Sequence, residues 1–298
     1  MRARYIVPTF AAAAAVLLLT GCVDNSTPAA TTPTDAGTTI EADAAAVALL
    51  PEDIKNAGVL IIGTDAAYPP NEYKDEAGAP IGWGIELADG IAAKLGLTTE
   101  YQIASFDNII PSITGGTVDI GESSFTDNLE REKQVDFVNY YNAGILWAAP
   151  TGSTVDPDNA CGLTVAVQDN TVQDTDELPA KSAACVAAGL EKIEVLPYGS
   201  QDEATNAVVL GKADALSADS PVTLYAISKT DGKLAPAGES FDTAPYGITV
   251  DKGSELTKAV QAALQSMVDD GSYGEILDAW GVTDGGIDTI TINAASNG

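Results

Sequence analysis

The stretch Val118–Asp136, VDIGESSFTDNLEREKQVD, is the part of the sequence that decides the fold. It begins with a short apolar run that is typical of a buried strand and continues with small and polar residues. Asp127 or Asn128 can cap a following helix, with Arg131 about one turn inside it. Hydroxyl and backbone N–H groups at a strand end, followed by a guanidinium, suit a small carboxylate, because arginine can donate two parallel hydrogen bonds to it. The alternative is a surface helix on which Arg131 pairs with Glu130 or Asp127.

The N-terminus has the pattern of an export signal. Residues 1–21 begin with basic residues and contain the apolar run Phe10–Leu19, which is too short to span a bilayer and is typical of a signal peptide. The run ends in Leu19-Thr20-Gly21-Cys22, which resembles the lipobox of bacterial lipoproteins, in which cleavage precedes the cysteine and its thiol receives a lipid. Residues 22–56 would then be a lipidated cysteine and a flexible tether. We expect a body anchored through Cys22 to the outer side of the cell membrane; the alternative is an ordinary signal peptide with an incidental cysteine.

The composition excludes several classes of partner and chemistry. The chain has 14 basic and 43 acidic residues and a formal net charge of −29, which argues against nucleic acid and against electrostatic binding to anionic lipid. It contains no histidine, so it lacks the usual general base, a common metal ligand and every Ser-His-Asp or Cys-His arrangement. We therefore expect neither a metal site nor a cofactor.

The chain has three cysteines, of which Cys22 is accounted for by the lipid. Cys161 and Cys185 remain, and in an oxidising compartment a disulfide is the economical pairing. A loop of this size would stabilise the fold by about 3 kcal/mol. Two free, buried thiols are the alternative.

Apolar runs of strand length alternate along the chain with amphipathic segments of helix length. The helical segments repeat apolar residues every three to four positions and end at glycines, as in Ile85–Leu95 followed by Gly96. This alternation predicts an α/β layer fold with a largely parallel sheet. We expect strands at 59–63, 99–103, 118–120, 145–149, 164–167, 194–196, 213–218 and 246–250, and helices at 85–95, 105–114, 201–210, 254–270 and 273–280, with one more beginning at Pro221.

Two segments share one pattern, in which Gly-x-x-Asp ends a helix and opens a strand: Gly116–Ile120 and Gly211–Ala215. Each strand then delivers polar residues at its carboxyl end, where ligands bind in open α/β sheets. Two similar lobes that face each other would place Arg131 on one wall of a cleft and Asp219 on the other. A free α-amino acid carries a carboxylate and an ammonium on one carbon, so an arginine and an aspartate are its natural complements.

At several separate places, in the right order, the residues resemble those of a known family. They are Val59–Asp65 with Tyr68, Pro70 and Glu72; Gly84–Ala88; Phe106 with Ile109–Ser112; Ser123–Arg131 with Val135–Phe137; Asp214 with Asp219; and Gly271–Tyr273 with Trp280. The body, from about Val59 to Gly281, resembles the polar amino-acid periplasmic binding proteins, the extracellular solute-binding subunits of ABC importers. The resemblance implies a two-lobed, periplasmic binding protein-like (type II) α/β fold with a ligand cleft between lobes that two hinge strands join.

The resemblance also implies how the chain is divided. Lobe 1 would be residues 57–141 with 247–283, lobe 2 residues 145–243, and the C-terminal tail residues 284–298. The connecting strands near Tyr141–Ile145 and Thr243–Gly247 would be the hinge. The protein would be a lipid-anchored, monomeric subunit that captures a polar or cationic L-amino acid by hinge closure and delivers it to a membrane permease.

The roles of the charged site residues follow from the same resemblance. Arg131 would hold the ligand carboxylate with the help of Ser124 and Thr126, and Asp219 would hold its ammonium. Asp65 would reach the side-chain end of the ligand. Because two carboxylates then face one guanidinium, we expect arginine, lysine, ornithine or a neutral polar amino acid rather than glutamate or aspartate.

The remaining expected contacts are apolar or lie in the second lobe. Tyr68 and Phe106 would sandwich the aliphatic stem of the ligand. The segment 168–173 stands where the family has a glycine- and threonine-rich turn but lacks glycine, so its backbone would approach the ligand less closely. The complete expected set is Asp65, Tyr68, Phe106, Ser123, Ser124, Thr126, Arg131, Gln168, Thr171 and Asp219.

A second function is open on the same scaffold, since a few relatives of this fold are catalysts. It is a cyclohexadienyl or arogenate dehydratase-like enzyme that acts on a cyclic carboxylate, with Glu122 or Asp65 as the proton donor. The lipobox and the use of Asp219 for an ammonium favour a binding protein over an enzyme.

Overall fold

The computed structural model of this protein describes residues 40–297. The expected signal peptide, Cys22 and most of the expected tether lie outside the described residues. None of the helices in the described part is both long and apolar enough to cross a membrane.

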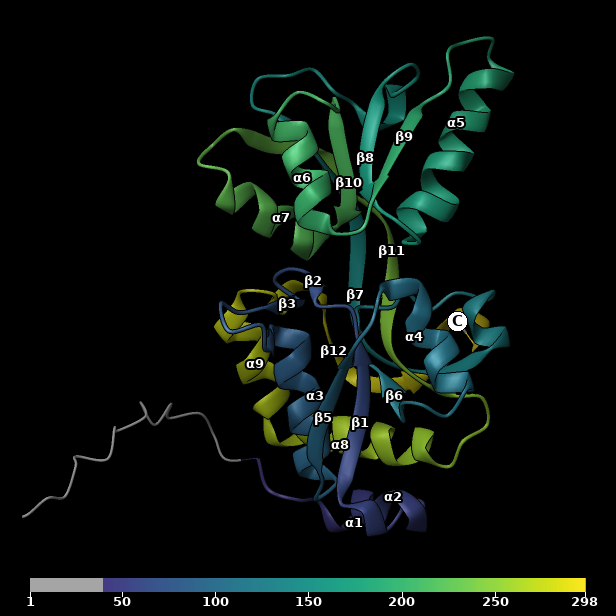
Figure 1. The fold of residues 1–298 in the computed structure, drawn as a ribbon, viewed down its shortest axis with the longest axis vertical. Coiled ribbons are helices and arrows are strands. Elements are labelled where there is room, and N and C mark those ends of the chain that lie inside the picture. The colour runs from purple at the N-terminus through teal and green to yellow at the C-terminus, as the bar shows by residue number, and fades with distance from the viewer. Residues whose placement is uncertain (1–39, 298) are drawn as a thin grey trace, which may run out of the picture. The chain divides into compact units, whose positions relative to one another are not determined.

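A mixed sheet runs through the described body and joins its two lobes (Figure 1). Within residues 40–297 it has nine strands in the order β5-β1-β6-β11-β7-β10-β8-β9, with β12 also paired to β7. They are β1 (Val59–Thr64), β5 (Thr98–Ile103), β6 (Ile120–Gly121), β7 (Val135–Pro150), β8 (Thr164–Gln168), β9 (Glu194–Tyr198), β10 (Ala215–Asp219), β11 (Leu234–Asp251) and β12 (Gly286–Ile292). Parallel pairing groups β5, β1 and β6 in one lobe and β10, β8 and β9 in the other, so the expected two-lobed α/β fold is confirmed.

The long strands β7 and β11 are shared by both groups. They pair antiparallel, and their register shifts between Ala237 and Phe241 and again between Phe241 and Ala244. Gly144 on β7 lies at this irregular stretch, where a Cβ would come 2.2 Å from the hydroxyl of Ser240, so only glycine permits the close approach. The irregular stretch coincides with the expected hinge. We call residues 151–233, between β7 and β11, lobe 2, and the part around β1, β5 and β6 lobe 1.

Lobe 1 has two apolar clusters between its sheet and its helices. The helices are α3 (Trp83–Lys94), α4 (Phe106–Thr114), α8 (Leu256–Asp270) and α9 (Ser272–Trp280). The large cluster lies around α3, α8 and α9, and the smaller one lies around α4. The buried residues of α8 are spaced as the sequence predicts, because Leu256, Val260, Ala263, Leu264 and Met267 share one face. A small second sheet, β2 (Ala67–Tyr68), β3 (Glu72–Lys74) and β4 (Pro80–Ile81), was not expected.

Lobe 2 packs helices α5 (Leu178–Ala187), α6 (Gln201–Val209) and α7 (Ser220–Lys229) around its strands. The expected disulfide is confirmed: Cys161, just before β8, is bonded to Cys185 on α5 with an S–S distance of 1.99 Å. A π-helix, Gln173–Glu177, leads into α5. Its last residue is buried, and Oε1 of Glu177 accepts a hydrogen bond from Nε1 of Trp147 (2.8 Å).

The repeated Gly-x-x-Asp pattern has the same structural role in both lobes. The backbone N–H of Asp119 donates to the oxygen of Ile61 (2.8 Å), and Oδ2 of Asp119 accepts the N–H of Ile61 (2.8 Å). Asp214 makes the same two bonds with Thr164, each also 2.8 Å long. In each lobe the aspartate therefore fastens the start of one strand to the first strand of that lobe.

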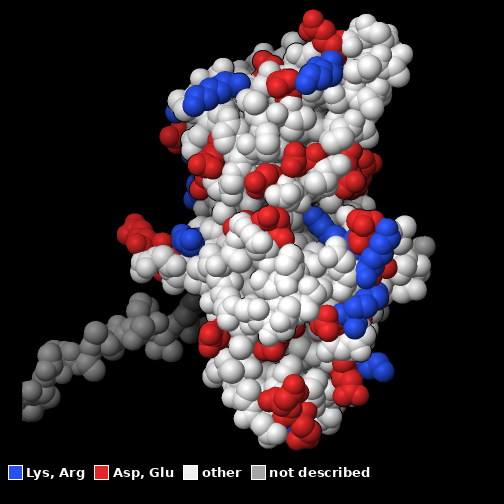
Figure 2. Space-filling model, turned by 45° about the vertical axis from the view of Figure 1, so that its right-hand side comes forward, with Lys and Arg blue, Asp and Glu red and all other residues white. Residues whose placement is uncertain are grey.

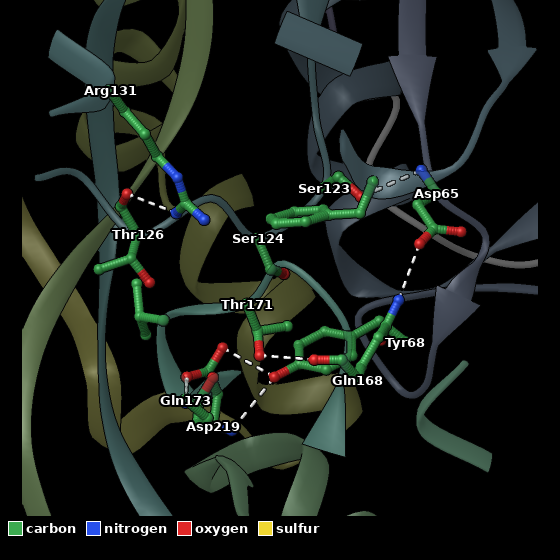
Figure 3. Close-up of a pocket in the computed structure, with 12 residues that line it drawn as sticks. Asp65, Tyr68, Ser123, Ser124, Thr126, Arg131, Gln168, Thr171, Gln173 and Asp219 are labelled. Carbon is green, nitrogen blue, oxygen red and sulfur yellow. Dashed lines mark hydrogen bonds between the residues drawn. The ribbon is translucent and has the colours of Figure 1, made fainter. Parts of the chain in front are cut away.

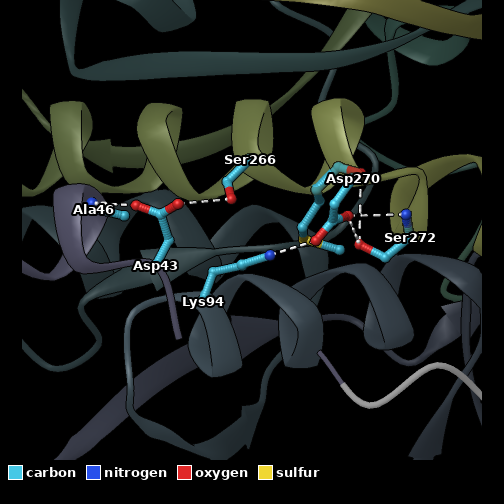
Figure 4. A network of polar contacts seen from close by, with 7 residues as sticks. Asp43, Ala46, Lys94, Ser266, Asp270 and Ser272 are labelled. Carbon is cyan, nitrogen blue, oxygen red and sulfur yellow. Dashed lines mark hydrogen bonds and ion pairs between the residues drawn. The ribbon is translucent and has the colours of Figure 1, made fainter. Parts of the chain in front are cut away.

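The described part of the chain begins with a segment fastened to lobe 1 (Figure 4). Asp43 accepts the backbone N–H of Ala46 (3.0 Å) and the hydroxyl of Ser266 on α8 (3.0 Å). Lys94 on α3 forms an ion pair with Asp270 at the end of α8. Part of the segment expected to be a tether therefore forms two short helices, α1 (Ala44–Val47) and α2 (Glu52–Ala57).

The segment expected to be a C-terminal tail is also structured. It forms β12, which pairs antiparallel with β7, and a last short helix, α10 (Ala294–Asn297). Ile290 of β12 is buried in the large cluster of lobe 1, and this burial explains why the segment is held.

Candidate ligand-binding site

A pocket lies between the two lobes, and all ten residues expected to contact the ligand line it (Figure 3). The cavity among these side chains has a volume of only about 10 Å³. The lobes thus enclose a narrow slot rather than an open cleft. The lining also includes Val172 and Gln173, to which the sequence analysis gave no role.

Four of the polar lining residues lie at strand ends, two at the parallel pair β1 and β6 and two at the parallel pair β8 and β10. Asp65 directly follows β1, Ser123 follows β6, Gln168 ends β8 and Asp219 ends β10. All four side chains are buried. The carboxyl ends of strands from both lobes therefore meet at one place, as the α/β pattern predicts.

The guanidinium of Arg131 lies over two aromatic rings. Its Cζ is 5.3 Å from the centre of the Phe106 ring and 5.5 Å from that of Phe125. Nη1 donates to the backbone oxygen of Thr126 (2.9 Å) and Nη2 to that of Asn170 (3.3 Å). Within the described residues no carboxylate forms an ion pair with Arg131, so the alternative of a surface helix with a neighbouring ion pair is not what the structure shows.

Arg131 opens a single 3-10 turn, Arg131–Lys133, instead of lying one turn inside a longer helix. Oδ1 of Asn128 accepts the backbone N–H of Arg131 (2.9 Å), so Asn128 supports the start of this turn. Burial lowers the pKa of Arg131 to about 10, which leaves the side chain charged at neutral pH. A guanidinium has five N–H donors, and two groups accept from it here, so it can still donate to a carboxylate.

Asp219 reaches the same pocket from lobe 2. Its Oδ2 accepts the hydroxyls of Tyr68 (2.9 Å) and Tyr246 (2.7 Å), and its Oδ1 accepts Nε2 of Gln173 (2.8 Å). Burial raises the pKa of Asp219, while these three hydrogen bonds and the charge of Arg131 lower it. Its side chain makes no capping hydrogen bond to α7. A guanidinium and a carboxylate from opposite lobes therefore line one pocket.

Asp65 provides a second carboxylate. Nε2 of Gln168 donates to its Oδ2 (2.8 Å), and its own N–H donates to the hydroxyl of Ser123 (3.0 Å). Burial raises the pKa of Asp65 to about 6. The Oε1 atoms of Gln168 and Gln173 are buried and have no hydrogen-bond partner among the described residues. Because only an amide nitrogen can donate to a carboxylate, these two oxygens are left as acceptors for N–H groups of a ligand.

Ser124 lines the pocket, as expected, and its hydroxyl is already hydrogen-bonded within lobe 1. Its backbone has a φ of 52°, in the left-handed region. Its hydroxyl donates to Oε1 of Glu72 (2.9 Å) and accepts from Nδ2 of Asn71 (2.8 Å), on the side away from the pocket. The side chain is therefore engaged with the wall behind the site.

Two polar groups of the site could not be found in the sequence. Tyr246 lies in an apolar run that predicts only a strand, and nothing marks its hydroxyl as a partner of Asp219. Gln173 is the first residue of the π-helix, and its Nε2 donates to Asp219 on the neighbouring strand β10. The absence of glycine from the segment 168–173 predicted only a less close approach of its backbone to the ligand, and it did not indicate this contact.

The sheet topology and the pocket between the lobes define a two-lobed solute-binding protein. Residues 60–283 match the family model of bacterial extracellular solute-binding proteins, family 3. The chain therefore belongs to this family.

Relatives and solved structures agree with this assignment. The arginine-binding protein ArgT of Corynebacterium glutamicum is 42% identical over 248 residues, which are 83% of this chain and 82% of that protein. The structure of an ancestral arginine-binding protein bound to arginine matches with a TM-score of 0.69 and 32% identity, over 75% of this chain and 98% of that one. An ancestral amino acid-binding protein described as a precursor of cyclohexadienyl dehydratase matches with a TM-score of 0.67 and 31% identity, over 77% and 98%.

Proposed function

We propose that this protein is the substrate-binding subunit of an ABC importer and that it binds arginine or a similar cationic L-amino acid. The observation that carries the proposal is the set of charges in one buried pocket: Arg131 with Asp65 and Asp219. The ligand's carboxylate pairs with Arg131, its α-ammonium with Asp219, and its cationic side chain extends toward Asp65. Each of these contacts is a charge-assisted hydrogen bond, which is about twice as strong as a neutral one.

The acceptors near Asp65 favour a ligand with several N–H groups. Asp65 and the unpartnered Oε1 of Gln168 lie together at this end of the pocket, with Oε1 of Gln173 beside Asp219. A guanidinium presents five donors in one plane and can satisfy more of these oxygens than an ammonium can. Two of the three relatives above, the ArgT protein and the ancestral protein bound to arginine, are named for arginine, and this supports the same ligand.

Binding by closure of the lobes is part of the proposal. The free space is too narrow for an amino acid to enter without movement. Three contacts join the lobes across it: Tyr68 to Asp219, Gln168 to Asp65, and Arg131 to the backbone of Asn170. The lobes separate by bending at the irregular stretch of β7 and β11, and the ligand replaces some of these contacts on closure.

The remaining features of the proposal concern the cell surface. Cys22 carries a lipid, the body faces outward, and a membrane permease receives the amino acid. Acidic side chains are spread over both lobes in Figure 2, and the whole chain has 43 acidic residues. Such a field attracts a cationic ligand and repels an anionic one.

The test is a calorimetric titration of the mature protein with arginine, lysine, ornithine, glutamine, glutamate and aspartate. We expect arginine to bind with at least micromolar affinity, which corresponds to about −8.2 kcal/mol, and glutamate and aspartate to bind weakest. Tightest binding by glutamate or aspartate would overturn the proposed charge assignment. Mass spectrometry of any ligand that remains bound through purification gives an independent answer.

The dehydratase alternative has less support from the geometry. Glu122, one of its two proposed proton donors, is buried but does not line the pocket. The other, Asp65, is held by Gln168. Incubation with a prephenate-like substrate tests this alternative, and turnover would favour the enzyme.

A further inference from the structure

Two glutamates are buried together behind the pocket. Glu72 on β3 and Glu122, which follows β6, are both fully buried. Both reach the start of α3, where a Cβ on Gly84 would come 2.2 Å from Oε1 of Glu72 and 2.7 Å from Oε1 of Glu122. The two carboxyl groups thus share one small space, and each affects the ionisation of the other.

No positive charge compensates this pair. Oε1 of Glu122 accepts a hydrogen bond from the hydroxyl of Tyr140 on β7 (2.8 Å), and Tyr101 on β5 also faces Glu122. Asp65 and Tyr68, in the segment that follows β1, face Glu72. In the described part of the chain, every ion pair involves carboxylates other than these two.

Two ionised carboxylates in contact, without water or a countercharge, would be strongly destabilised. One shared proton removes one of the two charges. The remaining charge is stabilised by the nearby hydroxyls and by the N-terminus of α3, which carries a partial positive charge. Burial is the main cause that raises the pKa of Glu122 to about 8, and it raises the pKa of Glu72 strongly as well. The two groups titrate as a unit.

The pair is joined to the ligand pocket through Ser124. This residue lines the pocket, and its hydroxyl bonds both oxygens of Glu72 (2.9 and 3.2 Å). Asn71 completes the link, because its Nδ2 donates to Ser124 and its Oδ1 accepts Nε1 of Trp83 (2.7 Å). The left-handed backbone of Ser124 is strained and persists only where its surroundings hold it. If the pair acquired a second negative charge, the repulsion could be reduced only by movement of the surrounding residues or by entry of water. Ser124 lies between the pair and the pocket, so such a change would affect the pocket wall.

We propose that Glu72 and Glu122 share one proton at neutral pH and act as positioning residues for Ser124, so that loss of this proton weakens ligand binding at alkaline pH. Ser124 then keeps its place on the pocket wall only while the pair carries a single charge. The effect on affinity rests on the proposed binding of arginine. The effect on the stability of the unliganded protein does not.

The experiment compares the wild type with Glu122→Gln, which has the shape of the protonated glutamate but cannot ionise. Glu72→Gln is the second variant, in case the first does not fold. The matched control is Glu86→Gln, an exposed position on the same helix α3. Arginine affinity is measured by calorimetry between pH 6.5 and 9.5, and the melting temperature of the unliganded proteins between pH 5 and 9. The α-ammonium of arginine also loses its proton in the upper part of this range, so the ratio of the affinities of variant and wild type is compared.

We expect the wild type to lose about tenfold in affinity relative to Glu122→Gln between pH 7 and pH 9, because one pH unit above the pKa reduces the protonated fraction about tenfold. The melting temperature of the wild type should fall relative to that of the variant as the pH rises from 5 to 9. The Glu86→Gln protein should follow the wild type in both measurements. Parallel pH profiles of the wild type and Glu122→Gln in both measurements would overturn the proposal. If none of the proteins binds arginine but the melting temperatures of the wild type and Glu122→Gln diverge with pH, the result supports the shared proton and contradicts the proposed ligand.

Discussion

Asp65 and Asp219 are both buried in the pocket, but their neighbours differ. Asp219 accepts from three side chains and also has the attraction of Arg131, and all of these favour its charged form. Asp65 has one side-chain donor, Gln168, and burial outweighs it, so its pKa is raised to about 6. The pocket therefore loses charge first at Asp65 when the pH falls.

Binding of arginine should weaken as the pH falls below about 6. Protonated Asp65 no longer attracts the guanidinium, and affinity should drop by up to about tenfold per pH unit below its pKa. Calorimetry between pH 5 and 8 measures this. The variant Asp65→Asn should bind more weakly at pH 8 and depend less on pH. An affinity of the wild type that stays constant from pH 8 to pH 5 contradicts the assignment.

Replacement of Arg131 by lysine should weaken binding of every α-amino acid. Lysine keeps the charge but loses the planar fork and the contact of the guanidinium with the rings of Phe106 and Phe125. We expect a loss of about tenfold to a hundredfold, equivalent to one charge-assisted hydrogen bond of about 1.5–3 kcal/mol. The control is Lys133→Ala on the same turn, where the exposed lysine pairs with Glu130. An Arg131→Lys protein that binds within threefold of the wild type disproves the role.

The residues of the pocket could be named from the sequence where they follow a strand or open a helix. Asp65 and Asp219 stand directly at strand ends and Phe106 opens α4; the resemblance to the family supplied the roles of Asp65 and Phe106. Tyr246 and Gln173 could not be named from the sequence. Tyr246 lies on β11 and Gln173 on the π-helix, and both contact Asp219 only in the folded structure. Such contacts depend on the geometry of two lobes, which a pattern within one segment does not contain.

Among the elements, the two Gly-x-x-Asp motifs make matched contacts that can be tested as a pair. Asp119→Ala and Asp214→Ala each remove a carboxylate that accepts one backbone N–H at a strand start. We expect each to lower the free energy of unfolding by about 1–2 kcal/mol, since hydrogen bonds to charged groups contribute about this much. Urea unfolding measures it. Asp278→Ala, at an exposed position of α9, is the control and should change stability by about 0.5 kcal/mol or less. If both motif variants lose no more free energy of unfolding than the control does, the proposed role of the two aspartates in holding the strand starts is contradicted.

Elements with a strong period or an apolar run were predicted well, and elements that depend on partners were missed. Helix α8 and strand β1 follow from the sequence because their own residues bury a face. Strands β2, β3 and β4 are two or three residues long, and β12 is held by pairing with β7 and by burial of Ile290. The π-helix before α5 is stabilised by buried contacts of Glu177 that join it to the sheet. Tertiary contacts decide these elements, so local preference could not.

For the molecule as a whole, stability without ligand should be higher at pH 5 than at pH 8. Burial raises the pKa of Asp65 and Asp127 to about 6 and that of Glu122 to about 8. Unfolded carboxyls have pKa values of about 4, so between pH 4 and 8 the folded state binds more protons, and its stability falls as the pH rises. We expect the melting temperature to be at least about 5 °C higher at pH 5 than at pH 8, since about 1 kcal/mol corresponds to roughly 2–4 °C in a protein of this size. Carboxyl groups whose pKa is lowered in the folded state, such as that of Asp270, become protonated only below this pH window, and only there does their protonation reduce the stability of the protein. A melting temperature that rises from pH 5 to pH 8 contradicts the prediction.

The chain leaves for lobe 2 at Pro150 and returns at Leu234, and these two residues are direct neighbours on β7 and β11. An inserted module whose two ends touch can be exchanged as one continuous piece. Gln168 and Asp219 travel with it, while Asp65 and Arg131 stay behind. Chimeras that carry this segment from a relative with another preference would therefore separate what each half of the recognition site contributes, with only two splice points to repair.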